Sequence, residues 1–199
     1  MYQEKLNKIL LKSKPSKYIY ELIENKEMEK YIPELIKLKG FDQHTPYHDK
    51  DVLDHTLAVV DNIEPKLNLR MSALLHDISK PDCFTLDTKG RGHFYGHHIK
   101  SSEKSEEILK RLGYDNDFIE DVKILIRYHY IKDIKNINTL EGLKKFINDV
   151  GVNRLSDMFE LNIADIKGKA NPDKFDDIEF IREKCYDYLN SVNYNIKAD

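Results

Sequence analysis

The stretch Leu74-Leu75-His76-Asp77-Ile78-Ser79-Lys80-Pro81 is the most informative part of this 199-residue chain. It places an imidazole and a carboxylate side by side at the end of a nearly all-apolar helical pattern. That pattern predicts a buried core helix, so His76 and Asp77 should emerge at a buried edge. Buried polar side chains need partners or ions, because desolvating them without a partner is costly. The pair therefore predicts a polar site at the centre of a helical protein.

Apolar residues recur at helical spacing along most of the chain, which predicts an all-α fold. Residues 1–45 are expected to form a helical lead-in packed on the core, interrupted at Pro15 and ending near Gly40. The glycine-containing segment between Pro81 and Gly96 predicts at most one small β-hairpin, at about residues 84–94. The other helices are expected over residues 52–63, 69–78, 99–112, 117–130, 140–150, 153–166 and 178–189.

The composition is that of an ordinary lysine-rich globular protein, with 40% hydrophobic and 34% charged residues. Lys plus Arg total 32 and Asp plus Glu total 35, which gives a formal net charge of −3. This balance argues against a strongly basic nucleic-acid clamp, so the sequence carries no strong DNA-binding signal. It leaves the oligomeric state open.

Cysteine usage and the lack of long apolar runs predict a cytoplasmic protein. Cys83 and Cys185 match no metal-knuckle or disulfide-framework spacing, so we expect both to be reduced packing residues. The N-terminus has no apolar core of signal-peptide length. No apolar run approaches the ~20 residues needed to span a bilayer, so no membrane partner is expected.

Further candidate metal ligands lie on other predicted helices. Nitrogen and oxygen ligands without cysteine suit a divalent or iron-type metal centre that performs chemistry. Asp77 is the candidate bridge, because a carboxylate has two oxygens and can contact two cations, which an imidazole cannot. Only one of His97 and His98 should face the centre, because adjacent helix positions lie ~100° apart. The candidate ligands, in chain order, are His55, His76, Asp77, His97, His129 and Asp165.

The order of these ligands resembles the HD phosphohydrolase superfamily. More closely, the chain resembles the C-terminal half of bacterial CCA-adding enzymes and related tRNA nucleotidyltransferases, over roughly residues 5–172. The matching stretches are Thr45-Pro46-Tyr47-His48, Asp51-Val52-Leu53-Asp54-His55-Thr56-Leu57, Leu74-Leu75-His76-Asp77-Ile78-Ser79-Lys80-Pro81 and Gly92-His93-Phe94-Tyr95-Gly96-His97.

The chain departs from that pattern at two positions and in one larger respect. The family usually has glycine where this chain has Ser79, and it favours an acid where this chain has His98. No upstream stretch supplies the glycine-serine loop and paired aspartates of a nucleotidyltransferase head. CCA addition by this chain alone is therefore not expected, and a separate nucleotidyltransferase partner is left open.

The resemblance implies an HD-domain helical bundle with the metal-binding domain at residues 46–170. The helical pattern adds a C-terminal helix at residues 171–199. It implies a phosphohydrolase that holds one or two divalent ions, with Mn, Ni, Co, Mg or Fe as candidates. His97 and His129 favour two ions; with His55, His76, Asp77 and Asp165 alone the site would be mononuclear.

The implied substrate is a nucleotide or RNA-end phosphate, either a phosphomonoester or a 2′,3′-cyclic phosphodiester, attacked by a metal-activated hydroxide. Asp77 and Lys80 are the candidate catalytic residues, with Lys80 also contacting the phosphate or the leaving group. Arg91, His93, His98 and His48 are weaker candidates for substrate binding.

Two other functions remain open from the sequence. One is a di-iron oxygenase, because some members of the superfamily use the same six-ligand pattern for that chemistry. The other is a non-catalytic module that binds RNA or nucleotides. Iron in a mixed-valence state with oxygen consumption would favour the first, and phosphate release with manganese, nickel or cobalt would exclude it.

Overall fold

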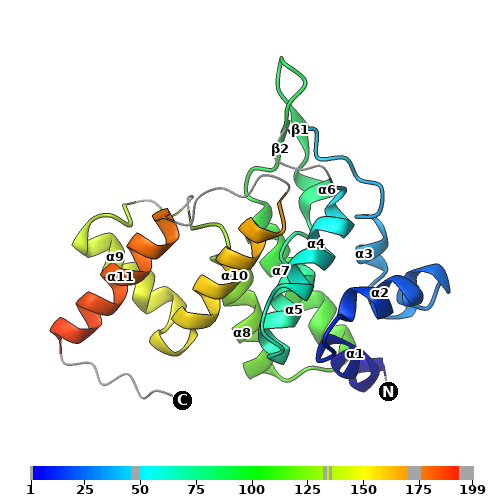
Figure 1. The fold of residues 1–199 in the computed structure, drawn as a ribbon, viewed down its shortest axis with the longest axis horizontal. Helices are drawn as coiled ribbons and strands as arrows, with labels where there is room; N and C mark the ends of the chain where they lie inside the picture. The colour runs from blue at the N-terminus through cyan, green and yellow to red at the C-terminus, as the bar shows by residue number, and fades with distance from the viewer. Residues whose placement is uncertain (1, 46–49, 132–133, 135, 170–175, 193–199) are drawn as a thin grey trace.

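The structure, a computed structural model, describes residues 2–45, 50–131, 134, 136–169 and 176–192 (Figure 1). It confirms the all-α expectation, with one two-stranded hairpin among the described residues. The α-helices are α1 (Tyr2–Leu10), α2 (Pro15–Glu24), α3 (Pro33–Ile36), α4 (Val52–Asp61), α5 (Leu67–Leu75), α6 (Lys80–Cys83), α7 (His97–Leu112), α8 (Asn116–Arg127), α9 (Leu140–Val150), α10 (Leu155–Lys167) and α11 (Asp176–Ser191). Two 3-10 helices, η1 (Met28–Lys30) and η3 (Val152–Arg154), precede α3 and α10.

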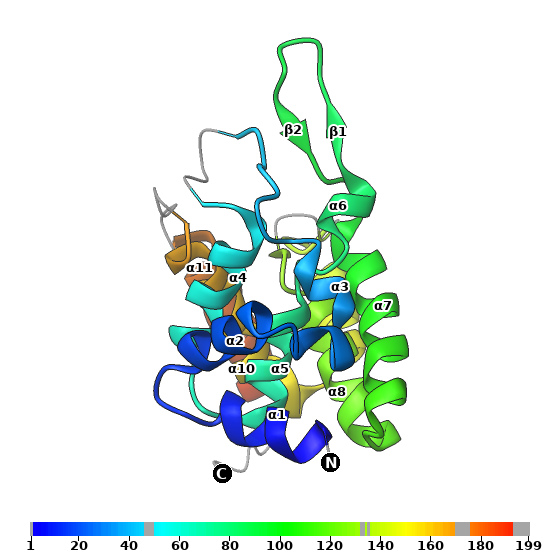
Figure 2. The same cartoon turned by 90° about the vertical axis from the view of Figure 1, so that its right-hand side faces the viewer.

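Helix α5 lies at the centre of the bundle because apolar residues cover nearly all of its surface. Leu69, Met71, Ala73, Leu74 and Leu75 are all inaccessible to solvent. Helices α4, α8 and α10 pack around it, and α1 and α2 cover α5 and α4 from the other side (Figures 1 and 2). Every residue from Leu69 to Leu75 is buried, Arg70 and Ser72 included, so neighbouring elements must cover this helix on nearly every side.

Side-chain caps define where the helices around this core begin. Asp51 accepts a hydrogen bond from the backbone N–H of Asp54 at 2.7 Å, and Asp115 accepts one from that of Phe118 at 2.8 Å. Each cap satisfies an N–H that the first helical turn leaves without a partner. At the C-terminal end of α7, Gly113 adopts a φ of 85°, and two backbone hydrogen bonds close the helix.

The hairpin joins α6 to α7 and projects from the helical body (Figure 2). Strands β1 (Thr85–Leu86) and β2 (Gly92–His93) pair antiparallel, with Thr85 opposite His93. At its base, the Gly92 N–H donates to the carbonyl of His44 at 2.9 Å. A Cβ on Gly92 would lie 2.1 Å from the carbonyl oxygen of Gln43, so only glycine allows this approach.

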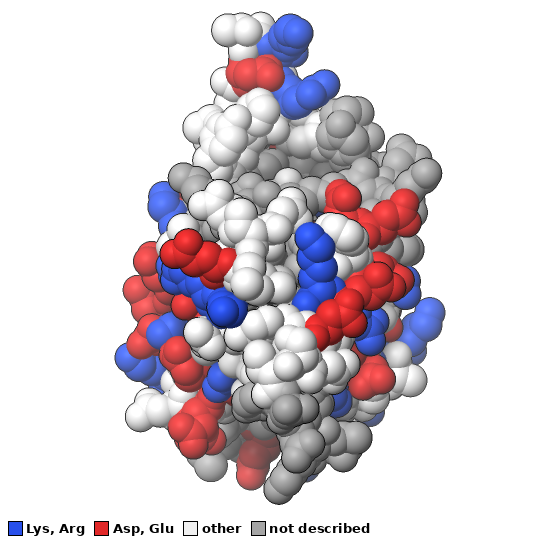
Figure 3. Space-filling model, turned by 90° about the vertical axis from the view of Figure 1, so that its left-hand side faces the viewer, with Lys and Arg blue, Asp and Glu red and all other residues white. Residues whose placement is uncertain are grey.

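Helices α9 and α11 pack together and against α10, on the opposite side from the lead-in (Figure 1). Acidic and basic side chains are intermixed on this face (Figure 3). No helix in the described part of the chain is both long and apolar to the degree required to cross a membrane.

Two of the expected helices end earlier than their apolar patterns suggest, just before candidate metal ligands. Helix α5 ends at Leu75 and α8 at Arg127, so His76, Asp77 and His129 lie in the turns that follow. Lys80 begins the short helix α6 instead of ending the preceding one. The second half of the helical lead-in contains two short helices, η1 and α3, with Pro33 in the first turn of α3. The expected boundary at residue 171 lies outside the described residues.

A buried arginine ties the lead-in to the core. Arg70 on α5 is 3% exposed, and its guanidinium donates to the carbonyls of Leu10 at 2.9 Å and Lys12 at 2.6 Å. It also donates to the carbonyls of Ile63 at 3.1 Å and Glu64 at 3.3 Å. These carbonyls lie at the end of α1 and in the turn between α4 and α5, where helices leave carbonyls without partners.

We expect Arg70→Ala to lower the free energy of unfolding by about 3 kcal/mol, because it leaves several buried carbonyls without donors. Urea denaturation followed by circular dichroism measures the change. Arg182→Ala, on the exposed face of α11, is the matched control and should alter stability by less than about 0.5 kcal/mol. Equal effects of the two substitutions would contradict the role assigned to Arg70.

Candidate metal centre

The structure brings all six predicted ligands to one place. His55 comes from α4 and Asp165 from α10, whereas the other four lie at helix ends or in the turns beyond them. Two sets of three residues place their ligand atoms within 4.8 Å of one another, and all members of both sets are buried. The first set is His55, His76 and Asp165, and the second is His76, Asp77 and His129.

Asp77 lies at the centre and presents its two oxygens to different groups. Oδ2 is 3.2 Å from His76 Nε2 and 3.6 Å from His55 Nε2. Oδ1 is 3.4 Å from His97 Nε2 and 3.9 Å from His129 Nε2. One carboxylate therefore connects two clusters of imidazoles, the arrangement expected of a bridging ligand.

Backbone carbonyls orient three of the four imidazoles. His76, His97 and His129 each use Nδ1 to bond the carbonyl three residues earlier in the chain, at 2.7, 2.8 and 2.6 Å respectively. These bonds assign the proton to Nδ1 and leave Nε2 directed at Asp77. A hydrogen bond of this kind fixes both the ring orientation and the tautomer of a metal-binding histidine.

Several buried nitrogen and oxygen atoms in the cluster have lone pairs without a well-placed hydrogen-bond donor in the described part of the chain, and a bound cation would satisfy them. The Nε2 atoms of His97 and His129 are 3.3 Å apart. Because both rings donate from Nδ1, these facing atoms carry lone pairs that repel each other unless they share a proton or a cation. Both oxygens of Asp77, and Nε2 of His76, also lack a hydrogen bond of normal geometry among the described residues. The donor set therefore fits a metal site of nitrogen and oxygen ligands.

Burial and charge give the four histidines different protonation states. Burial lowers the pKa of His97 to about 4 and lowers that of His55. Burial and the neighbouring His76 also hold the pKa of His129 well below its usual range. At His76, burial acts in the same direction, but the charge of Asp77 and the hydrogen bond with Asp165 outweigh it and raise the pKa to about 10. In the metal-free protein at neutral pH, His76 alone among these four carries a second proton.

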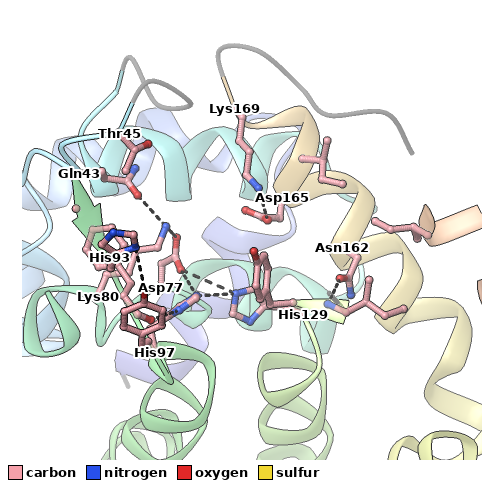
Figure 4. Close-up of a pocket in the computed structure, with 17 residues that line it drawn as sticks. Gln43, Thr45, Asp77, Lys80, His93, His97, His129, Asn162, Asp165 and Lys169 are labelled. Atoms are coloured by element: carbon pink, nitrogen blue, oxygen red, sulfur yellow. Dashed lines mark hydrogen bonds and ion pairs between the residues drawn. The ribbon is translucent and has the colours of Figure 1, made fainter. Parts of the chain in front are cut away.

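Each carboxylate in the cluster is also paired with a lysine. Lys80 Nζ lies 2.7 Å from Asp77 Oδ2, and Lys169 Nζ lies 3.3 Å from Asp165 Oδ2 (Figure 4). Burial would raise the pKa of Asp165, but the charge of Lys169 and the hydrogen bond from His55 hold it well below its usual range. Both acids therefore remain ionised, as metal ligation requires.

Two contacts behind the ligands hold their positions. Asn162 on α10 accepts from the N–H of Ile131 at 3.1 Å and donates to the carbonyl of Tyr128 at 3.1 Å, which clamps the turn that carries His129. Gly168 lies against His55, where an added Cβ would be 2.8 Å from Val59 Cγ2 and 3.2 Å from the His55 ring. The end of α10 therefore supports ligands from two other segments.

A cavity of about 530 Å³ opens beside the cluster. Asp77, His97, His129 and Asp165 form its polar floor, and both lysines line it (Figure 4). Its volume falls within the range of small-molecule sites, roughly 300–1,000 Å³.

Only some of the predicted substrate-binding residues line the cavity. Lys80 and His93 line the cavity, whereas Arg91 is exposed on the hairpin and is not part of the lining. His98 lines a separate pocket of about 320 Å³ with Tyr128 and Phe146, so it is directed away from the ligand cluster. His48 lies outside the described residues.

Sequence reasoning missed Lys169, Gln43 and Asn162. Lys169 follows Asp165 by four residues, a spacing that brings opposite charges together on a helix and could have suggested the pair. Gln43 accepts from Lys80 Nζ at 2.8 Å and is buried, but nothing in its local sequence distinguishes it from a loop residue.

Comparisons with known proteins match the region that carries these ligands. A protein-family model described as HD domain matches residues 51–162, more than half of the chain. The A-adding tRNA nucleotidyltransferase of Deinococcus radiodurans is 29% identical over 92 residues. That match spans 43% of this chain but 21% of that enzyme's length.

We expect metal binding to release about one proton per protein near neutral pH, because a cation must displace the second proton of His76. Apparent affinity should therefore rise with pH up to that pKa of about 10. Calorimetric titration of manganese into the metal-free protein, in buffers of different ionisation enthalpy, measures the release. An enthalpy that does not depend on the buffer would contradict this assignment.

We expect Gly168→Ala to weaken metal binding by about tenfold to a hundredfold, the usual effect of disturbing the support of a ligand. The backbone φ of Gly168 is −71°, which alanine adopts without strain, so the effect arises from contact with His55 and Val59. Metal content after dialysis measures it, with the neighbouring Lys167→Ala as control. Unchanged affinity in the Gly168 variant would show that His55 tolerates the displacement.

Proposed function

Because the chain belongs to the HD domain family, a superfamily of metal-dependent phosphohydrolases, we propose that it hydrolyses a phosphate ester of a nucleotide or of an RNA end. The observation that carries this proposal is the carboxylate of Asp77, with its two oxygens facing two sets of imidazoles beside a lysine-lined cavity. Metal ligands and phosphate-binding cations in one cavity are the two requirements of such a reaction.

The ligand arrangement suits two divalent ions. His55, His76, Asp165 and Oδ2 of Asp77 would hold one, and His97, His129 and Oδ1 of Asp77 would hold the other. Manganese, nickel, cobalt, magnesium and iron remain the candidates, since histidine and carboxylate ligands accept several of these ions. When bound, such ions lower the pKa of a coordinated water toward neutrality and neutralise charge on phosphate oxygens.

Lys80 and Lys169 supply the chain's own cations for the phosphate. Both ammonium groups are largely buried, line the cavity and lie within 3.3 Å of a carboxylate of the ligand cluster. Metal binding at these carboxylates would compete with the lysines and free their N–H donors to face the substrate. Lys80 is anchored for this role by Gln43 and by the ring of Phe94, 5.4 Å from its Nζ.

The similarity to a tRNA nucleotidyltransferase, more than the cavity itself, supports a nucleotide or RNA-end substrate. The similar enzyme from Deinococcus radiodurans is named for adding A to tRNA, so it handles a nucleotide and an RNA end. A phosphomonoester or a 2′,3′-cyclic phosphodiester at such an end presents an accessible phosphorus to the cavity. No contact described above favours oxygenase chemistry or a purely binding role over hydrolysis.

We expect His76→Ala and Asp77→Ala each to abolish phosphate release, since each removes a ligand from the centre of the cluster. The wild-type protein is first assayed against a panel of nucleotide phosphomonoesters and cyclic phosphodiesters with several divalent metals, alongside metal analysis. Circular dichroism checks that both variants fold. Full activity in both variants would refute the site. Oxygen consumption with iron and no phosphate release would favour the oxygenase.

We expect Lys80→Met to lower kcat/KM by about 100-fold or more while metal content is retained, because it removes a donor to the developing phosphate charge. Lys100→Met, at an exposed position on α7, is the matched control and should change little. A Lys80 variant with wild-type kinetics would assign the residue a structural role only.

A further inference from the structure

An exposed tyrosine at the rim of the cavity is held in a fixed position. Tyr95 is 76% exposed, and one face of its ring stacks on His93, with the ring centroids 5.2 Å apart and the planes 5° from parallel. The Tyr95 hydroxyl donates to His93 Nδ1 at 3.2 Å. The other face of the tyrosine ring is left open to solvent.

The hairpin turn fixes the histidine beneath this ring. His93 Nε2 donates to Asp87 Oδ2 at 3.1 Å, so its Nδ1 is the acceptor for Tyr95. The other oxygen of Asp87 accepts from the N–H groups of Lys89 at 2.8 Å and Arg91 at 2.9 Å. Hydrogen bonds therefore run without a break from the turn through His93 to Tyr95, and hold both rings parallel.

The short segment between β2 and α7 connects this pair to the metal centre. Phe94 lies between His93 and Tyr95 in the chain and lines the same cavity. Its carbonyl accepts from Nδ1 of the metal-ligand candidate His97 at 2.8 Å, and its ring packs against Phe84 and beneath Lys80. His93 and Tyr95 line the cavity together with Asp77 and Lys80 (Figure 4).

We propose that Tyr95, supported by His93, is a stacking platform for the base of a nucleotide whose phosphate lies at Lys80 and the ligand cluster. The position of the phosphate rests on the proposed function. A phosphate group fills only a small part of a 530 Å³ cavity, so the remaining space must accept the group attached to it. Aromatic rings bind bases of any identity through their faces, and a tyrosine already held in place loses little freedom on binding.

The first test compares two phosphomonoesters that differ only by the base, adenosine 5′-monophosphate and ribose 5-phosphate. Tyr95→Ala should raise KM for the nucleotide by about tenfold, in line with base stacking, and leave KM for ribose 5-phosphate unchanged. Tyr95→Phe keeps the ring but loses the hydroxyl bond to His93, so its KM for the nucleotide should lie between those of the wild type and Tyr95→Ala. Leu86→Ala, at a position that is 54% exposed on the hairpin but outside the cavity lining, should change neither constant.

The second test does not depend on catalysis. The chain contains no tryptophan, so Tyr95→Trp introduces a single fluorophore at the platform. Adenosine, which has no phosphate, should quench its fluorescence in a saturable manner, and ribose should not.

The results separate this inference from the proposed function. Absence of quenching by adenosine, or an equal rise in KM for both phosphomonoesters in Tyr95→Ala, would overturn the platform while leaving hydrolysis intact. Quenching without phosphate release from any ester would support the platform and refute the proposed hydrolysis.

Discussion

The buried carboxylate of Asp77 is the constraint on which the site and its surroundings depend. A carboxylate that is 1% exposed loses its hydration, which costs several kcal/mol unless charged or polar groups replace the water. Here an ammonium group and four imidazoles lie within 4 Å of its two oxygens. Because these groups come from different parts of the chain, the helix ends that carry them must converge on one point.

Polar side chains link the segments that converge there. Gln43 reaches from the loop before α4 to Lys80, and the neighbouring backbone of His44 receives the base of the hairpin. Asn162 on α10 forms hydrogen bonds with the backbone of Tyr128 and Ile131 in the turn after α8. The hairpin, the lead-in loop and α10 are thereby connected to the ligands through short hydrogen bonds.

Sequence periodicity predicted the helices well, because apolar spacing reports which face of a helix is buried. It predicted the ends less well, since the apolar runs continue to Ile78 and through Tyr128 although the helices stop before His76 and His129. The six candidate ligands could be named from residue type and order, with the resemblance to a known family. Gln43 and Tyr95 could not, because their importance arises from contacts between segments that local sequence does not encode, whereas the spacing of Lys169 from Asp165 could have indicated that pair. The angle between neighbouring helix positions predicted that only one of His97 and His98 faces the centre, and the structure places His97 there and His98 in a separate pocket.

The two lysine–carboxylate pairs bear on whether the protein needs a metal ion in order to fold. Small zinc domains collapse without their ion because little else stabilises them. Here Lys80 and Lys169 act as internal counter-ions for Asp77 and Asp165, and the apolar core around α5 is built from other residues. We therefore expect the metal-free chain to fold, with any ion entering afterwards in exchange for the ammonium groups at these carboxylates. The ion that the protein carries would then depend on which ions are available to the folded chain.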